Sequence, residues 1–363
     1  MVSALGAWVL LALLAPAAGG GLDDVVGLPA DEAARVARDL LFHPHPSVHL
    51  QGAAWRNADV RSAALDSWLE QVAAVLTAGP MPDQAAADAW ADHVTGGLIR
   101  RFPLDVAGAL VVLASAVAAS IEWHLPLDVV GADVVTLPRA PGFAGVQRLL
   151  HSGVDDEQFL ASTDLGLLAV HAGRSAGDDL DVVSVCGPPD AAPGDVLAEA
   201  YRLAVAVAGA DPGLARTDLF DLPLGDGHAW TLTERMTTRG GRHQRVESVL
   251  PAWSADTDLD LTSASTGFPR AAQTLAGLVG DPALPTEARQ QAMARYTRTG
   301  FEAAAVTAVG VRASAIIARD GVERTATLQF VRPYAVVAVA RADAGPWSGL
   351  PVFSAWVTRA DEP

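Results

Sequence analysis

Hydrophobic and polar positions in the first third of the chain recur mainly at the spacing of helices. Ala30–Leu41 predicts a helix, because the acidic residues Asp31 and Glu32 occupy its first turn. The uninterrupted apolar run Ala109–Val117 is typical of a strand that is covered on both faces. Further patterns predict helices at Arg61–Val75 and Asp83–Arg100 and a short strand at Val48–Ala54.

The middle of the chain carries strand patterns. Leu167–His171 and Leu180–Val185 are apolar runs joined by a turn-rich stretch, which predicts a β-hairpin. Asp195–Ala208 has the pattern of a helix. Because helices and strands are mixed without regular β–α–β alternation, the sequence predicts an α+β fold.

A second hairpin is predicted between the strands Trp230–Met236 and Gln244–Leu250, with its turn at Gly240 and Gly241. Basic residues gather on this hairpin, which allows either a binding site for an anionic polymer or an exposed charged turn. The second interpretation is favoured. The residues concerned are Arg235, Arg239, Arg242, His243 and Arg245.

The apolar N-terminal segment Val2–Ala18 also allows two interpretations. It ends near small residues, as secretory signal peptides do, but nothing before Asp23 is charged, and such peptides begin with positive charge. For a membrane span it is short and contains Gly6 and Pro16. The residues favour a helix that is buried on all sides in a large core.

Composition narrows the possible functions. The chain has 363 residues, half of them hydrophobic, and a formal net charge of −17. This acidic balance excludes a general nucleic-acid binder, because such proteins need a basic surface against the phosphates. The single cysteine, Cys186, excludes an intramolecular disulfide and a CxxC zinc site, and its apolar neighbours predict a buried side chain.

Two short motifs point only weakly to chemistry. Gly173–Gly177 matches the GxSxG pattern of hydrolase nucleophiles, with Ser175 at its centre. Because a strand-like stretch follows where that motif needs a helix, a surface turn is favoured and a serine hydrolase is kept as an alternative. His43, His45 and His49 have no carboxylate or thiolate at metal-site spacing, so no metal site is predicted.

The stretch Gly300–Val309 has conflicting preferences. Its Glu-Ala-Ala-Ala run favours a helix, whereas Val306–Val311 favours a strand. A segment of small residues that fits more than one conformation is a candidate for conformational change.

The same stretch carries a resemblance to a known family. Gly300 and the run Glu302–Val309 resemble the hinge of the serpins, whose pattern is Gly-Thr-Glu followed by small residues and Thr-Ala. Further serpin landmarks follow in the family's order over most of the chain. They are Trp90, Thr95, Gly97 and Ile99, then Leu110–Ala116 with Glu122–Leu127, then Leu250, Pro251, Trp253, Asp260 and Leu261, then Phe330–Tyr334, and finally Val352–Val357. On these motifs the chain is similar to the serpins, and a bacterial, actinobacterial-like member is expected.

The resemblance implies the fold and its boundaries. It implies one serpin domain over residues 1–363, with three β-sheets, about eight helices and an exposed reactive-centre loop. Residues 2–19 would be the family's buried helix B, residues 298–327 the hinge and loop, and residues 328–358 the C-terminal strands. The family's helix A would then be missing, which predicts an N-terminally truncated or mis-started chain.

The resemblance also implies a function and a mechanism. A serpin is not an enzyme: its loop is bait for a serine protease, which cleaves the loop and is held as a covalent acyl-enzyme while the loop inserts into the central sheet. Because strand residues alternate between faces, Phe301 and alternate residues after it would point inward. The hinge residues are Gly300, Phe301, Glu302, Ala303, Ala304, Ala305, Val306 and Thr307.

The scissile bond follows from the family's usual spacing. That spacing predicts cleavage between Ser314 and Ala315, which suits elastase-like or subtilisin-like proteases with shallow pockets. Two alternatives suit trypsin-like proteases. They are the bonds Arg312–Ala313 and Arg319–Asp320.

Some residues depart from the family pattern around the switch region, which contains Trp123 and Ser115. Ser115 stands where the family has an Asn, Gln290 where it has a His, and Gly6 where it has a Ser. Phe301 replaces a small Thr, and large inward residues overpack a narrow core at about 1–3 kcal/mol each. We therefore expect Phe301 to slow the first step of insertion, and a non-inhibitory serpin whose loop is cut without insertion is the alternative.

The expected partner is a target serine protease in a covalent complex, and the expected state is a monomer. No cofactor, metal, nucleic acid or membrane is expected. The resemblance implies an extracellular location, with the cytoplasm as the alternative because the sequence carries no convincing signal peptide.

Overall fold

The computed structural model describes residues 2–153, 157–281, 287–301, 320–341 and 345–363. These residues form seven α-helices and five hydrogen-bonded sheets, and the predicted α+β class is confirmed. The chain separates into two compact units, which are described one at a time. Unit 1 comprises residues 1–119, 255–293 and 344–347, and unit 2 comprises the remainder. The single domain over residues 1–363 stays a prediction.

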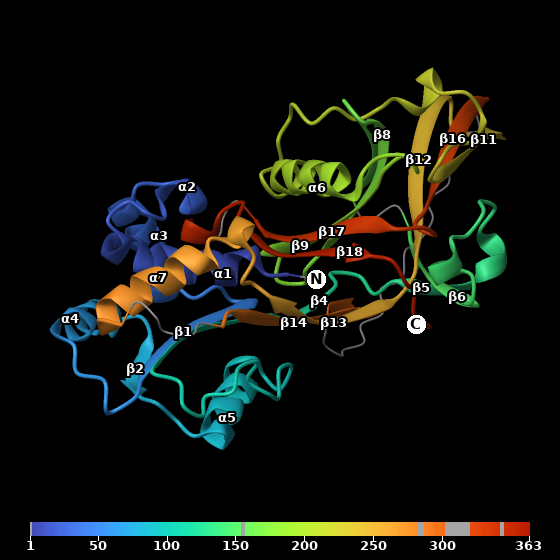
Figure 1. The fold of residues 1–363 in the computed structure, drawn as a ribbon. Coiled ribbons are helices and arrows are strands. Elements are labelled where there is room, and N and C mark those ends of the chain that lie inside the picture. The colour runs from blue at the N-terminus through green and yellow to red at the C-terminus, as the bar shows by residue number, and fades with distance from the viewer. Residues whose placement is uncertain (1, 154–156, 282–286, 302–319, 342–344) are drawn as a thin grey trace. The chain divides into compact units, whose positions relative to one another are not determined.

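Unit 1 contains most of the helices and a three-stranded sheet (Figure 1). Its helices are α1 (Ala4–Leu14), α2 (Asp23–Val26), α3 (Ala30–Phe42), α4 (Ala63–Val72), α5 (Gln84–Val94) and α7 (Phe268–Val279). The sheet has the order β2 (Thr77–Pro80), β1 (Val48–Arg56), β3 (Val111–Ala119), with β1 parallel to β2 and antiparallel to β3. Two further strands, β13 (Trp253–Asp260) and β14 (Arg289–Tyr296), pair with each other and run from one unit into the other.

The apolar N-terminal segment forms α1. Ser3 caps the helix by accepting a hydrogen bond from the Gly6 amide at 3.3 Å. Because the helix carries no charged residue and is apolar all round, it buries most of its surface, including every residue of Val9–Leu14. The predicted buried helix is confirmed. No helix among the described residues is long and apolar enough to cross a membrane.

The helix predicted over Asp83–Arg100 is shorter in the structure. It begins after Asp83, which caps it, and ends at Val94, because Gly96 and Gly97 adopt positive φ angles of 62° and 87° that a helix does not allow. Its inner face packs against β1 through Trp90, whose ring lies 5.3 Å from that of Trp55.

The apolar run predicted as a strand covered on both faces is β3, and its burial alternates. Val112, Ala114 and Ala116 are buried, whereas the residues between them, including Leu113 and Ser115, are only half-buried. Residues 111–116, from both faces of the strand, line a cavity. Helix α5 packs against the face with Val112 and Ala114, and α1 contacts Ser115 on the other face, so the prediction of cover on both faces is confirmed.

A five-stranded antiparallel sheet forms the core of unit 2, and α6 (Pro193–Ala208) packs against it (Figure 1). Its order is β18 (Pro351–Val357), β17 (Tyr334–Ala340), β9 (Leu180–Cys186), β8 (Gly166–Arg174) and β7 (Glu157–Thr163). The predicted hairpin corresponds to β8 and β9 and is confirmed. Cys186 is buried, as predicted.

A six-stranded sheet completes unit 2, together with the short pair β4 (Ile121–Glu122) and β15 (Gly300–Phe301). Its order is β10 (Gly225–Asp226), β11 (Trp230–Thr237), β16 (Gly321–Gln329), β12 (Gly241–Leu250), β6 (Arg148–Ser152) and β5 (Asp128–Gly131). The predicted second hairpin was wrong, because β11 and β12 do not pair with each other. β16, from much later in the chain, lies between them and pairs with both (Figure 1).

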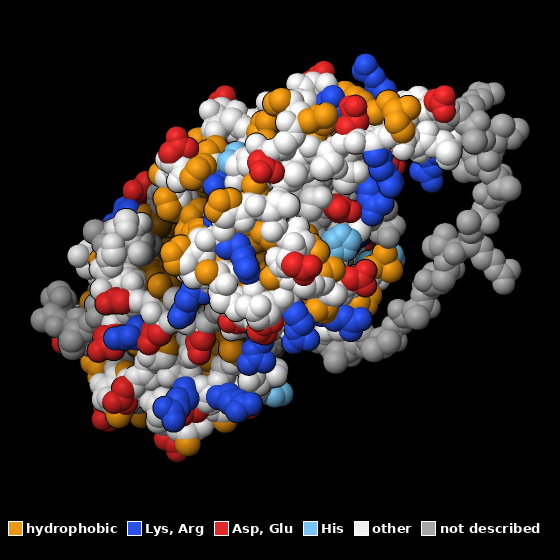
Figure 2. Space-filling view, turned by 90° about the vertical axis from the view of Figure 1, so that its right-hand side faces the viewer, with side chains coloured by type: hydrophobic (Ala, Val, Ile, Leu, Met, Phe, Trp, Pro, Cys, Tyr) orange, Lys and Arg blue, Asp and Glu red, His pale blue; other side chains and the backbone are white. Residues whose placement is uncertain are grey.

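The basic residues of β11 and β12 are largely engaged. Arg235 pairs with Glu323, Arg245 lies 3.2 Å from Glu247, and the guanidinium of Arg242 stacks 4.9 Å from the ring centre of Phe220. Figure 2 shows acidic and basic side chains interspersed over the face that it presents. These contacts favour the exposed charged surface over a polyanion site.

Candidate functional site

The first two residues of the predicted hinge are already part of a sheet. Gly300 and Phe301 form β15, which pairs antiparallel with Glu122 and Ile121 of β4. A tight turn precedes it, because the amide of Thr297 donates to the carbonyl of Gly300 at 3.0 Å. The chain therefore reverses direction just before the hinge and starts a new strand along β4.

Gly300 is required by the close approach of this pairing. A Cβ placed on it would lie 2.1 Å from the carbonyl oxygen of Ile121 and 3.0 Å from the Cα of Glu122. Both neighbours are backbone atoms, which cannot move aside as a flexible side chain can. The glycine that carried the sequence resemblance therefore has a steric reason at this position.

Phe301 lies inside a cluster of four aromatic rings, which we call the aromatic box: Trp123, Trp253, Tyr296 and Phe301. Phe301 is 4% exposed, and its ring meets Trp253 edge-on at 6.3 Å. Tyr296 joins the two tryptophans, at 4.9 Å from Trp123 and 6.1 Å from Trp253. The bulky residue expected to obstruct insertion thus has a place to be buried, and its effect on the rate stays a prediction.

Trp123 also holds the turn before the hinge. Its indole Nε1 donates to the carbonyl of Thr297 at 2.9 Å, and its amide donates to the carbonyl of Thr299 at 3.0 Å. The ring lies close to Gly173, where a Cβ would come within 3.1 Å of it. The predicted switch residue Trp123 therefore fixes the turn and forms one wall of the aromatic box.

Ser175, at the centre of the GxSxG motif, opens an exposed turn, but its own side chain is buried. It is 2% exposed, its hydroxyl donates to Asp179 at 2.6 Å, and it accepts from the amides of Asp179 and Leu180. The predicted surface turn is confirmed, because Ala176, Gly177 and Asp178 are exposed, although the Ser175 side chain itself is buried and closes the turn from within. A hydroxyl so bonded and buried has no access to a substrate, which argues against the hydrolase alternative.

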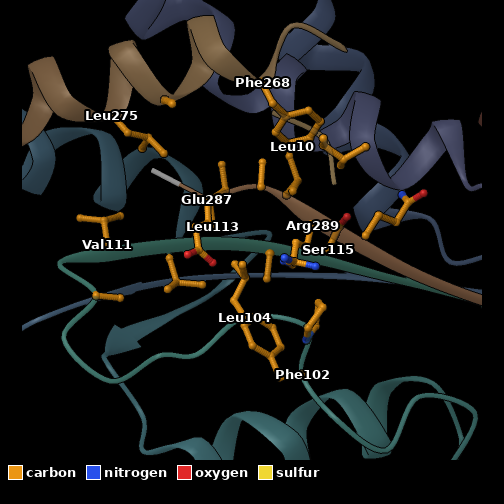
Figure 3. A pocket seen from close by; sticks show the side chains of 18 of the residues that line it. Leu10, Phe102, Leu104, Val111, Leu113, Ser115, Phe268, Leu275, Glu287 and Arg289 are labelled. Atoms are coloured by element: carbon orange, nitrogen blue, oxygen red, sulfur yellow. The ribbon is translucent and has the colours of Figure 1, made fainter. Parts of the chain in front are cut away.

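Unit 1 contains a cavity of about 350 Å³ that is lined mostly by apolar side chains. In Figure 3, Leu10, Phe268 and Leu275 approach it from the helices on one side, and Phe102 and Leu104 from the other side. Residues of β3 and of the start of β14 line it between these layers. Among the described residues β3 pairs only with β1, and β14 only with β13. We call this cavity the slot.

Two strands of the slot are tied to the first turn of α1. The Ser115 hydroxyl of β3 donates to the carbonyl of Gly6 at 2.8 Å. The Gln290 side chain of β14 donates to the carbonyl of Ser3 at 2.8 Å and accepts from its amide at 3.1 Å. Gly6 is needed here, since a Cβ on it would lie 2.8 Å from Val117. The replacements seen in the sequence thus make a consistent set of contacts within unit 1.

The other predicted site residues lie partly in the two units and partly outside the described residues. Ser115 belongs to unit 1 and Trp123 to unit 2, so the two switch residues are described separately. Asp320 is exposed and immediately precedes β16, so the loop predicted to reach residue 327 ends earlier. The remaining hinge and scissile-bond residues lie outside the described residues: Glu302, Ala303, Ala304, Ala305, Val306, Thr307, Arg312, Ala313, Ser314, Ala315 and Arg319.

Solved structures match this arrangement over nearly the whole chain. Tengpin, a thermophilic serpin in its native state, matches with a TM-score of 0.62 and 13% identity, covering 98% of this chain and 87% of its own. The chain has the serpin fold. Thyroxine-binding globulin in complex with thyroxine matches with a TM-score of 0.61 and 15% identity, over 99% of this chain and 92% of its own.

A third serpin-fold structure is Serpin48, described as highly specific, from the insect Tenebrio molitor. It matches with a TM-score of 0.59 and 14% identity, over 99% of this chain and 91% of its own. No family model and no curated protein sequence matches the chain. The fold that the six ordered motifs implied is therefore confirmed by structure.

Sequence reasoning missed two walls of the aromatic box. Trp253 is predicted only as part of a motif, and Tyr296 is not predicted as a site residue. Their role depends on pairing between segments far apart in the chain, which no local pattern records. An aromatic residue just before a small-residue hinge is the only signal that the sequence offers for Tyr296.

Proposed function

We propose that this serpin-fold protein inhibits serine proteases as a suicide substrate. The main observation behind this proposal is the pairing of Gly300–Phe301 with β4. Because β15 has already begun beside β4, insertion of the loop would only need to extend it. The slot also supports the proposal. It is lined by β3 and β14, and each of these strands has one edge without a strand partner among the described residues. A strand added there would satisfy the backbone groups of both edges.

The proposed reaction follows from ordinary protease chemistry. The serine Oγ of the protease attacks the carbonyl carbon of the scissile bond, its proton passes to the leaving amine, and the C–N bond breaks. The product is an ester between the protease and the upstream part of the loop. Extension of β15 would then carry the esterified protease away before water hydrolyses the ester.

The proposed scissile bond is Ser314–Ala315, with Arg312–Ala313 and Arg319–Asp320 as alternatives. A small residue before the bond would select elastase-like or subtilisin-like proteases, and an arginine would select trypsin-like ones. We propose an extracellular monomer, as the resemblance to the serpins implies, with the cytoplasm as the alternative location.

A limited-proteolysis experiment tests the function without knowledge of the target. The loop is nicked with subtilisin, the cut is confirmed by mass to lie between Val309 and Arg324, and thermal melting is compared before and after. A large rise in melting temperature is expected, followed by protease complexes that survive denaturing electrophoresis. An unchanged or lower melting temperature would refute insertion.

The second candidate is a non-inhibitory serpin-fold binding protein, favoured by the burial of the bulky Phe301 in the aromatic box. One fold neighbour is described as a complex with thyroxine, so the fold also serves in binding proteins. The variant Phe301→Thr separates the two. If the parent does not inhibit and the variant does, the ring was the obstacle, and if both inhibit equally fast, Phe301 does not limit insertion.

A further inference from the structure

The slot in unit 1 has an apolar helix face along one side. Four residues of α7 line it at the spacing of one helix face: Phe268, Ala272, Leu275 and Val279. All four are only half-buried, so the slot leaves part of this apolar face uncovered. A guest with an aliphatic chain would remove that surface from water, which is favourable.

The opposite walls of the slot are apolar as well. Phe102 and Leu104 come from the segment after α5, and Val111 and Leu113 from β3. Figure 3 shows these side chains on the other side of the space from the helices. A volume of about 350 Å³ lies at the lower end of the range for small-molecule sites. That size suits a short aliphatic chain.

The charged side chains that line the slot select the sign of the guest. Among the described residues they are Asp105, Glu287 and Arg289. The guanidinium of Arg289 lies 3.3 Å from the carboxylate of Asp258, so its charge is engaged. Asp105 accepts a hydrogen bond from the amide of Ala107 at 2.9 Å, a bond that supplies no positive charge. The slot therefore favours a cation over an anion.

Glu287 is placed to meet the cationic head of such a guest. It lies just before β14 and is exposed, so a cation beside it stays in contact with water and avoids the cost of burying a charge. In Figure 3 it lies between the helix layer that carries Leu275 and the opposite layer that carries Phe102. An ammonium group beside the Glu287 carboxylate would thus leave its chain next to apolar walls.

We propose that the slot binds an amphiphilic amine, with the aliphatic chain against the half-buried face of α7 and the ammonium group beside Glu287. The formal net charge of −17 supports a cationic guest, because it draws cations toward the protein. The site goes beyond the proposed function, since binding of the amine needs neither a protease nor a cleaved loop.

Calorimetric titration of the intact protein with matched probes tests the site. Nonylamine, 1-nonanol and nonanoate share a nine-carbon chain and differ in the head group. Nonylamine is expected to bind about tenfold more tightly than nonanoate, with nonanol between them. Butylamine keeps the head group but lacks five methylene groups, and should bind at least about a hundredfold more weakly than nonylamine. Absence of nonylamine binding, or nonanoate binding of equal affinity, would overturn the proposal.

Two variants test the residues that are assigned to the head and to the chain. Glu287→Gln should weaken nonylamine binding about threefold and leave nonanol binding unchanged. Glu70→Gln is its control, because Glu70 is an exposed carboxylate of α4 outside the slot. Ala272→Phe fills the slot from α7 and should abolish nonylamine binding, and Val205→Phe, at an exposed position of α6, is its control.

Nonylamine binding that neither Glu287→Gln nor Ala272→Phe alters would overturn the assignment. If Ala272→Phe fails to fold, the probe series and the Glu287→Gln comparison still decide.

The amine site and the proposed function fail separately. If the loop inserts after nicking, the added strand occupies the slot, and nicked protein should no longer bind nonylamine. Nicked protein that binds nonylamine as the intact protein does, with no rise in melting temperature, would refute insertion and support the amine site.

Discussion

Phe301→Ala tests whether the hinge is paired before cleavage. The ring is 4% exposed and touches Trp253 in the aromatic box, so its removal leaves a cavity beside β4. Truncating a buried phenylalanine costs about 3–5 kcal/mol, and the lower value applies where a chain segment can relax. The intact protein should therefore lose about 3 kcal/mol of unfolding free energy.

The expected shift in melting temperature follows from chain length. At about 2.1 cal/mol/K per residue, 363 residues give an unfolding entropy of about 0.76 kcal/mol/K. A loss of about 3 kcal/mol then lowers the melting temperature by about 4 °C. Phe42→Ala is the matched control, because Phe42 is 57% exposed and its truncation should change the unfolding free energy by less than about 0.5 kcal/mol.

The assay compares intact and nicked protein by differential scanning calorimetry. If Phe301 occupies the box both before and after cleavage, the substitution lowers both melting temperatures by a similar amount, and the rise on cleavage equals that of wild type. If the intact variant melts like wild type and only the nicked form is weakened, the hinge is not paired in the intact protein. That result would refute our account of β15.

Three further predictions concern separate parts of the molecule. Gly300→Ala places a Cβ 2.1 Å from the Ile121 carbonyl and should release β15, which would speed subtilisin cleavage of the loop several-fold. Ser115→Ala removes the hydrogen bond to Gly6 and should lower the unfolding free energy in urea by about 1 kcal/mol. Burial lowers the pKa of His228 from 6.5 to about 4, so its neutral form is favoured in the folded protein. Stability is then fully present above pH 6.5 and falls by about 1–2 kcal/mol toward pH 4, allowing for partial exposure, and His228→Asn should lack this loss.

Each of these has a contradicting result. Unchanged cleavage kinetics for Gly300→Ala would mean that the hinge does not approach β4 so closely. A Ser115→Ala protein as stable as wild type would mean that the hydrogen bond from Ser115 to Gly6 of α1 makes no net contribution to the unfolding free energy. A His228→Asn variant with the same acid dependence as wild type would assign the acid sensitivity to other groups.

Some elements were predictable because their cause is local. The helix α3 is predicted within one residue, since its first-turn acids and its apolar spacing lie within the helix itself. Helix α1 is predictable because an apolar stretch without charged residues is most stable when it is buried in a core. Gly300 was found by its place in a motif, although its reason, the carbonyl of Ile121, lies far away in the chain.

The tertiary structure decided what depends on pairing between distant segments. Strand propensity identified β11 and β12, and their proximity predicted a hairpin, but propensity does not say which strand becomes the neighbour. β16 lies between them because it supplies edges to both, and no residue in either strand encodes that choice locally. In the same way Tyr296 and Trp253 become walls around Phe301 only after the chain has folded. The sequence by itself thus determined the fold class and those elements whose cause is local, whereas the surroundings of Phe301 and the place of β16 between β11 and β12 come from contacts that only the folded chain creates.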